Sequence, residues 1–498
     1  MSSDPAPHHH RLDAQFAGGL AWTAGAKWMT QFVTWLSVLI AARLLSPSDF
    51  GTVEMAGFVG SVANVLAEFG IGAAALQMRE LSRRSLAQLN TVAFLFSTLA
   101  FAVCAVSAPL VAAFFRSPQL RLLIVVNSVG FFITGFQSVP LGLLQRDLDY
   151  RRLSIAEAVQ AIGQAVILVC GAAAGLGYWS LVAAPLSGKA MAAALAVFWR
   201  PVSYAMPRWK EVAAPMRFGL EVSGSRAAWV LYSQSDGIVV GRLLGRSALG
   251  TYRLAIDLAS APAEKIGMLI MRVTGPLFAR VQNDLALVRR YFLFISDALA
   301  LAIFPLVFGL AIVAPQAVPA LLGQKWTAAI VPLQFLALYT VLRSLSTLVT
   351  QVLTSLRYTT FLLWVSLFTI TLMPASFFVA AHWGIGAVAA AWIVMSPLTV
   401  LPPAIKLFRA IHCSLREYVA ILTPALAGTA AMVCAVFLVR WILPAGWTPA
   451  SILAIEVAAG GAAYAGILLG FYRPLVLRYV DFIKRVRNDR NAAIIAEI

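Results

Sequence analysis

Long apolar segments, repeated along almost the whole chain, constrain this sequence more than any other feature. About fourteen stretches of helix length contain few charges and are separated by short polar gaps. An apolar run of ~20 residues lets a helix cross a hydrocarbon core ~30 Å thick. Only 12% of the residues are charged, about half the share of an average soluble domain. The sequence therefore predicts an all-α integral membrane protein with about fourteen transmembrane helices.

The expected spans differ from the connections between them in hydropathy. They are 18–43, 51–78, 88–114, 120–145, 154–175, 178–199, 218–242, 248–272, 290–314, 328–355, 359–381, 384–405, 418–440 and 448–471. No connection is long enough to hold a folded domain, and the sequence lacks a P-loop motif. We therefore expect no ATP-hydrolysing domain, and an ion gradient would have to supply the energy for uphill transport.

The distribution of Lys and Arg predicts the orientation of the chain. With the N-terminus in the cytoplasm, 24 of the 38 Lys and Arg fall on the cytoplasmic side and seven on the outer side. Cytoplasmic loops of membrane proteins carry such an excess. The sequence thus predicts a multi-pass inner-membrane protein with both termini in the cytoplasm. The same pattern accounts for the formal charge of +17 without nucleic-acid binding.

An internal repeat divides the predicted helices into two lobes. Arg43–Thr52 matches Arg242–Thr251 at an offset of 199 residues, and Arg, Leu, Leu, Ser, Gly and Thr recur in register. Six spans separate the copies, so both cross the membrane in the same direction, as in parallel-repeat transporters. The expected parts are a tail at 1–15, an N-lobe at 16–205, a C-lobe at 206–412, a helix pair at 413–475 and a basic tail at 476–498.

Cations inside the predicted spans suggest an anionic substrate. An ionisable group within a span costs on the order of 3 kcal/mol, so each one is a functional candidate. Lys27 and Arg226 occupy equivalent positions in the two repeats and would flank a cavity between the lobes. Two such cations suit a phosphate or pyrophosphate, and Lys189 and Arg253 are further candidates. The alternative is that each cation is neutralised by a nearby carboxylate.

Carboxylates in the spans are candidates for ion coupling. Asp236 lies in a polar patch of an apolar helix, and Asp257, Glu68 and Glu157 also interrupt apolar segments. Asp257 follows Arg253 by four residues, so the alternative for this pair is mutual neutralisation on one helix face. Other charges in the spans, including Glu264, Arg343 and Glu456, receive no assigned role. We expect no catalytic residue, metal site or cofactor.

Several segments resemble bacterial polysaccharide flippases of the multidrug/oligosaccharidyl-lipid/polysaccharide exporter superfamily. The segments that carry the resemblance are Arg43–Gly51, Glu68–Gly72, Leu144–Arg152, Gly175–Leu181, Tyr232–Gly245 and Leu249–Tyr252. The similarity covers most of residues 12–475 and is closest to the exopolysaccharide and lipopolysaccharide branch. The family has no strict catalytic motif that could be carried over to particular residues.

The resemblance implies translocation of an undecaprenyl-pyrophosphate-linked oligosaccharide from the cytoplasmic to the periplasmic leaflet by alternating access. It also implies membrane lipids, a polymerase and polysaccharide export machinery as partners. Two transporters of the same fold remain as alternatives, a cation-coupled multidrug exporter and a lipid II flippase. A membrane enzyme is disfavoured because the outer connections are too short for a catalytic loop.

Overall fold

The structure is a computed structural model that describes residues 30–68, 82–147, 149–207, 229–443, 447–475, 477–479 and 481. Within these ranges the chain is helical apart from turns and the non-helical segment 201–207, and it has no strand, which confirms the predicted all-α fold. The chain forms two compact units, Met1–Gly250 and Thr251–Ile498. The expected division of the lobes between residues 205 and 206 stays a prediction.

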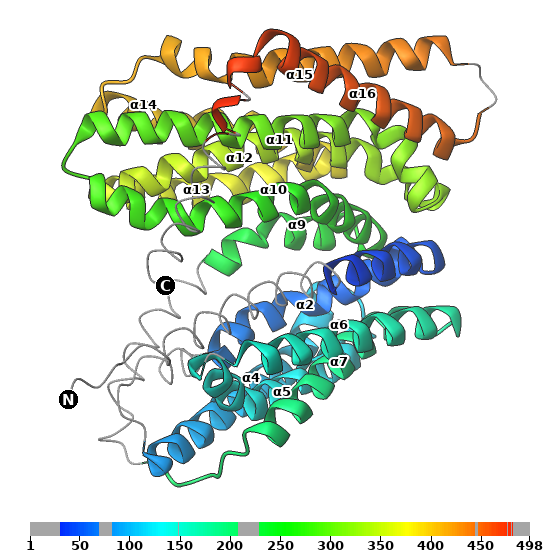
Figure 1. Ribbon diagram of the computed structural model, residues 1–498. Coiled ribbons are helices and arrows are strands. Elements are labelled where there is room, and N and C mark those ends of the chain that lie inside the picture. Colours follow the sequence, from blue (N-terminus) through cyan, green and yellow to red (C-terminus); the bar gives the residue numbers. More distant parts are fainter. Residues whose placement is uncertain are drawn as a thin grey trace, which may run out of the picture. The chain divides into compact units, whose positions relative to one another are not determined.

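The first unit is built from long apolar helices that pack side by side (Figure 1). They are the helix Thr30–Leu44, α2 (Pro47–Glu68), α4 (Arg83–Phe114), α5 (Leu120–Arg146), α6 (Tyr150–Ala173), α7 (Tyr178–Trp199), the short α9 (Ser235–Leu243) and the start of α10 (Arg246–Val281). Side-chain caps fix some of the ends. The Ser82 hydroxyl accepts from the Ser85 N–H at 3.0 Å, and the Asp149 carboxylate accepts from the Arg152 N–H at 3.2 Å, which satisfies helix-terminal donors.

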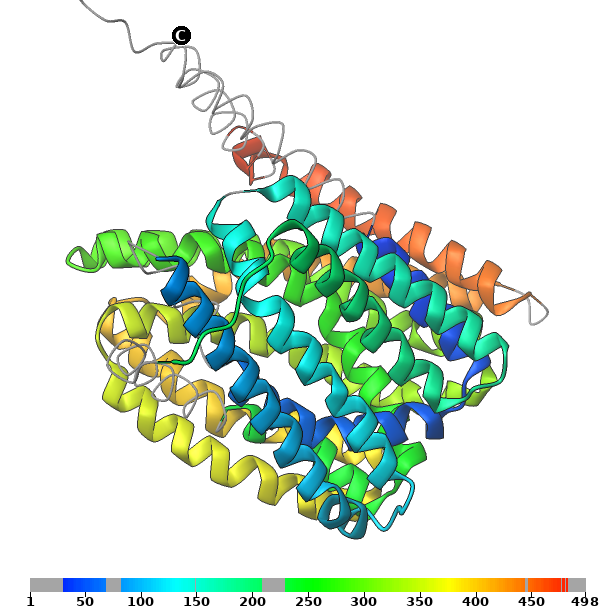
Figure 2. The same ribbon diagram turned by 90° about the horizontal axis from the view of Figure 1, so that it is seen from below.

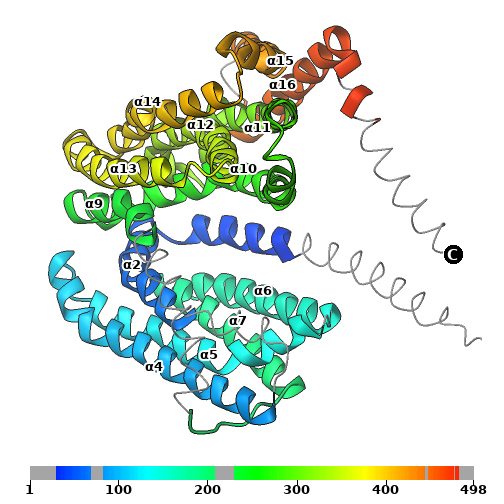
Figure 3. The ribbon, with the colours of Figure 1, turned by 90° about the vertical axis from the view of Figure 1, so that its left-hand side faces the viewer.

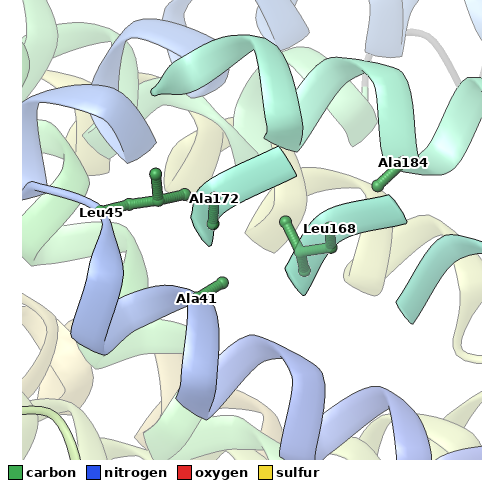
Figure 4. Close-up of a cluster of buried hydrophobic side chains, with 5 residues drawn as sticks. All are labelled: Ala41, Leu45, Leu168, Ala172 and Ala184. Atoms are coloured by element: carbon green, nitrogen blue, oxygen red, sulfur yellow. The ribbon is translucent and has the colours of Figure 1, made fainter. Parts of the chain in front are cut away.

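Small side chains let the helices of this unit approach closely. Ala41 and Leu45 pack against Leu168 and Ala172 of α6 and Ala184 of α7, and all five are buried (Figure 4). Alanine at such contacts brings backbones near one another, which is how membrane helices gain van der Waals contact without a hydrophobic driving force.

An extended segment, residues 201–207, follows α7 and lies along the start of α4 (Figure 2). The Ala205 N–H donates to the hydroxyl of Thr91 at 3.1 Å, and the Asn90 amide donates to the Val202 carbonyl at 3.3 Å. Because these bonds satisfy polar groups of the segment, its backbone can leave α7 without losing all of its hydrogen bonds.

The two copies of the repeat meet at two glycines within the first unit. Pro47 opens α2, where its missing N–H is harmless, and Ser46 and Asp49 bond reciprocally across this helix start. A Cβ atom on Gly51 would lie 1.7 Å from the Arg246 carbonyl oxygen, and one on Gly250 would lie 1.9 Å from the Pro47 carbonyl oxygen. The helix starts therefore touch backbone to backbone, and only glycine fits at both positions.

The second unit holds the rest of α10 and the remaining long helices. They are α11 (Leu285–Leu321), the 3-10 turn η1 (Gln324–Ala329), α12 (Ile330–Ser355), α13 (Thr359–Ala380), the 3-10 turn η2 (Ala381–Trp383), α14 (Ile385–Ala410), α15 (Leu415–Ile442) and α16 (Pro449–Phe471). The C-terminal pair α15 and α16 packs against α11 (Figure 3).

The chain just after α16 is tied to α11 by one tyrosine. The ring of Tyr479 stacks on Phe294 with centroids 5.1 Å apart, and its hydroxyl donates to Asp297 Oδ2 at 2.8 Å. Burial of the phenol beside the Asp297 carboxylate raises the pKa of Tyr479, so the hydroxyl stays protonated and can donate. The beginning of the basic tail is thus held against the second unit.

Ten helices among the described residues are long and apolar enough to cross a membrane. They coincide with ten of the expected spans, from 88–114 to 178–199 and from 290–314 to 448–471. The four other expected spans overlap the helix Thr30–Leu44, α2, α9 and α10. Each expected span therefore overlaps a described helix, and the chain is a multi-pass membrane protein.

Candidate functional site

Three charged residues of α10 lie on one helical face within an expected span. Arg253, Asp257 and Glu264 are separated by four and seven residues, and this spacing places their side chains in one row. Arg253 Nε lies 3.4 Å from Asp257 Oδ1, so the expected i, i+4 pair forms. The Asp257 side chain is nevertheless 59% exposed, and the second unit does not bury it.

Helix α12 adds a second cation to this row. Arg343 Nη2 lies 3.5 Å from Glu264 Oε1, and about half of each side chain is exposed. We call Arg253, Asp257, Glu264 and Arg343 the charged face. Charged side chains within a membrane avoid lipid and face either a protein interior or water. These four groups are exposed in their own unit, so the charged face is a polar surface within the expected spans.

An aromatic cluster fixes the helices that carry the charged face. The indole N–H of Trp392 on α14 donates to the hydroxyl of Tyr252 on α10 at 3.2 Å. The ring of Trp392 also packs on Tyr339 of α12 and Phe377 of α13, each with centroids 4.8 Å apart. Aromatic pairs at such distances hold packing partners in one geometry. The cluster thus joins four helices of the second unit beside Arg253.

Two candidates of the first unit lie on the neighbouring helices α6 and α7. Glu157 of α6 is exposed and Lys189 of α7 is half-buried. Within the described part of the chain neither side chain forms an ion pair. Both remain candidate polar groups in an otherwise apolar bundle.

Asp236 is buried in the first turn of α9. Its Oδ1 accepts from the Gly237 N–H at 2.7 Å, and a carboxylate near a helix N-terminus is stabilised by the helix dipole. Two residues earlier, the Gln234 amide donates to the Ser61 hydroxyl of α2 at 2.9 Å. The polar patch noticed in the sequence therefore joins α9 to α2, while the expected coupling role of Asp236 stays a prediction.

Several sequence-derived candidates lie outside the described residues. Lys27 and Arg226 lie in the segments 1–29 and 208–228, which the structure does not describe. Glu68 is the last residue of α2, and its side chain is not described either. The facing of the two cations across the lobes stays a prediction. The described candidates that the structure brings together are Arg253 and Asp257.

The pairing of Glu264 with Arg343 was missed in the sequence, although a signal for it exists. Both residues lie near the middle of their expected spans, 248–272 and 328–355, and both spans cross in the same direction. Opposite charges at equal depth can meet if their helices are neighbours. The missing information was that α10 and α12 are close enough for this contact.

Comparisons with known proteins identify relatives that are named for polysaccharide biosynthesis. The model of a family described as polysaccharide biosynthesis protein matches residues 40–331. The chain is 27% identical over 340 residues to the teichuronic acid biosynthesis protein TuaB of Bacillus subtilis, covering 67% of this chain and 70% of TuaB. It is 28% identical over 330 residues to the succinoglycan biosynthesis transport protein ExoT of Rhizobium meliloti, covering 64% and 65% of the two chains.

Among solved structures, the lipid II flippase MurJ has a similar fold. The TM-score is 0.68 at 13% sequence identity, and the match covers 92% of this chain and 100% of MurJ. At this identity the likeness concerns the fold alone. Together with the family match, it confirms the resemblance noted in the sequence and the multi-helix transporter fold.

Proposed function

The chain belongs to the polysaccharide biosynthesis protein family, and on this premise we propose that it moves a lipid-linked oligosaccharide across the bacterial inner membrane. The substrate would be an undecaprenyl-pyrophosphate-linked oligosaccharide that passes from the cytoplasmic to the periplasmic leaflet by alternating access. A polymerase and export machinery would then use it for surface polysaccharide. ExoT, a relative named as a transport protein, supports a transporter rather than an enzyme.

The charged face is the observation that supports this proposal most directly. A flippase must carry a polar headgroup through a layer that excludes polar groups, so it needs a wet surface at the depth of the span. Glu264 and Arg343 are half-exposed at this depth. Lipid exposure of such a pair would be costly, whereas a water-filled path accommodates both the pair and a sugar headgroup.

In the proposed site, cations bind the substrate and carboxylates bind the coupling ion. Lys27, Arg226, Lys189 and Arg253 would bind the pyrophosphate, because ionised donors form strong hydrogen bonds to phosphate oxygens. Asp236, Asp257, Glu68 and Glu157 would take up a coupling ion. The excess of Lys and Arg in alternate loops supports a cytoplasmic location of both termini.

Deletion of the gene tests the proposed function. The deletion strain is expected to lose surface polymer and to accumulate the pyrophosphate-linked oligosaccharide, because synthesis continues while translocation stops. Mass spectrometry of extracted lipids measures the intermediate, and restoration by the wild-type gene is the control. Unchanged sugars together with new sensitivity to cationic drugs would contradict the proposal and support a drug exporter.

The ion pair of the charged face gives a sharper test. Arg343→Ala is expected to lower polymer export at least roughly tenfold, because the proposed path then loses a cation at the depth of the span and Glu264 loses its partner. The exchange variant Glu264→Arg with Arg343→Glu should recover part of the export. Polymer per cell, divided by the amount of protein in the membrane, is the quantity to measure.

The matched control is Arg200→Ala. Arg200 pairs with Asp147 between helix ends, and both side chains are about as exposed as those of the Glu264–Arg343 pair. Because this pair lies outside the spans, its loss should change export little. Equal loss in both alanine variants would contradict a special role for the charged face.

A further inference from the structure

Helix α12 carries a row of exposed threonines below Arg343. Thr347, Thr350 and Thr354 are all exposed, and their spacing of three and four residues places them on the same helical face as Arg343. We call these three residues the hydroxyl face. It begins one turn from the Arg343–Glu264 pair and runs toward the end of α12 that the Lys and Arg distribution places in the cytoplasm.

Each hydroxyl of this face has already used its hydrogen. Thr347 donates to the Arg343 carbonyl at 2.8 Å, Thr350 to the Ser346 carbonyl at 3.0 Å and Thr354 to the Thr350 carbonyl at 2.8 Å. A hydroxyl that donates its single hydrogen still has oxygen lone pairs that accept. The hydroxyl face therefore presents acceptors, which suit a ligand that can donate.

A buried contact to α10 holds α12 in place beside the hydroxyl face. The Thr274 hydroxyl donates to Gln351 Oε1 at 2.7 Å, and Gln351 lies between Thr350 and Thr354 in sequence. By contrast, the exposed residues of α13 include Leu363, Trp364 and Phe368, the composition of a surface in contact with lipid. The hydroxyl face is thus polar and continuous with the charged face.

The chemistry of the face distinguishes among the parts of the proposed substrate. A pyrophosphate at neutral pH offers mainly acceptors, and a polyprenyl chain offers neither donors nor acceptors. Sugar hydroxyls both donate and accept, so they can donate to the threonine oxygens while Arg343 donates to them and Glu264 accepts. We propose that the hydroxyl face binds the sugar units of the substrate from the cytoplasmic side. This inference rests on the proposed function.

The test uses purified full-length protein and two lipid probes. The variant combines Thr347→Val, Thr350→Val and Thr354→Val, which keep the side-chain shape and remove the oxygen. The probes are the lipid-linked oligosaccharide extracted from the deletion strain and undecaprenyl pyrophosphate without sugar. We expect the triple variant to bind the glycosylated probe roughly tenfold more weakly than wild type and to bind the sugar-free probe equally well.

The matched control combines Thr371→Val and Thr423→Val on α13 and α15. Both threonines are exposed and donate to the carbonyl four residues earlier, at 3.0 Å and 3.1 Å, but neither lies on α12. This variant should bind both probes like wild type. If the triple variant fails to fold, the pair Thr347→Val with Thr350→Val replaces it, with an expected loss of about fivefold.

The outcomes distinguish failure of the hydroxyl face as a sugar site from failure of the proposed function. A triple variant that binds the glycosylated probe as tightly as wild type overturns the role of the hydroxyl face and leaves the proposed function intact. Equal loss for both probes also overturns it, because the face would then not recognise sugar. Wild-type protein that binds neither probe overturns the proposed function as well.

Discussion

Gly250→Ala is expected to destabilise the protein by about 3 kcal/mol, the upper end of the usual cost of overpacking. The new Cβ atom would lie 1.9 Å from the Pro47 carbonyl oxygen and 2.6 Å from the Gly51 backbone nitrogen. These are backbone atoms of a helix start, so no side-chain rotation can make room. Gly51→Ala should have a similar effect, because its Cβ atom would meet the backbone of Arg246. The midpoint of unfolding in an SDS titration measures both losses.

Glycines elsewhere on the same two helices provide the controls. A Cβ atom on Gly57 of α2 or on Gly267 of α10 would meet nothing within 4 Å. Alanine at these helix-interior positions should be neutral or stabilise by up to about 1 kcal/mol. If Gly250→Ala unfolds at the same SDS concentration as Gly267→Ala, the result contradicts a close backbone contact between the two helix starts.

Loss of Glu456 is expected to be the second large effect. Arg440 Nε lies 2.9 Å from Glu456 Oε1, and its Nη2 donates to the Ile312 carbonyl at 3.0 Å and to Gln316 Oε1 at 2.9 Å. Glu456 is fully buried, and the network joins α11, α15 and α16. Glu456→Ala should destabilise by about 3 kcal/mol, because it removes a fully buried carboxylate and its two charge-assisted hydrogen bonds to Arg440, whose side chain is 30% exposed.

A double substitution tests the reason for this loss. Arg440→Met with Glu456→Leu removes both charges, and it should recover most of the stability lost in Glu456→Ala. Glu417→Ala is the comparison, since Glu417 pairs with Arg289 between α15 and α11 while both side chains remain partly exposed. Its loss should be clearly smaller. Thermal unfolding in detergent measures all three, and equal losses for Glu417→Ala and Glu456→Ala would contradict the account.

The spans could be predicted from the sequence because a backbone that crosses lipid can adopt few secondary structures. A backbone without water must satisfy its polar groups internally, so each long apolar run becomes a helix. Helix ends were harder to predict. Pro402 and Pro403 lie near the end of an expected span, yet α14 continues to Ala410, and α11 contains three prolines within its 37 residues. Pro305 and Pro315 leave the carbonyls of Leu301 and Ala311 without an N–H partner in α11. The Tyr464 hydroxyl of α16 and the Gln334 amide of α12 donate to these carbonyls at 2.7 and 3.0 Å, and a single sequence does not show such neighbours.

The candidate site was only partly visible, because pairs depend on which helices are neighbours. Arg253 and Asp257 share a helix, so their contact follows from a spacing of four residues. Glu264 and Arg343 lie on different helices, and their contact required the packing of α10 beside α12. Arg440 falls at a predicted outer loop boundary, so its bond to the buried Glu456 was not apparent from hydropathy. The part of the site that was predictable is the part that is local in sequence.

The contact between the two helix starts bears on how such a chain could arise. Gly51 meets Arg246 and Gly250 meets Pro47, and each member of one contact lies 199 residues from its counterpart in the other. In a homodimer with two-fold symmetry, every contact between residues i and j is repeated between j and i. A shorter ancestor containing one copy could have formed this contact with itself, with a single glycine serving both sides. After a duplication and fusion the two positions could mutate separately, but the lack of space at both contacts would still require glycine at each.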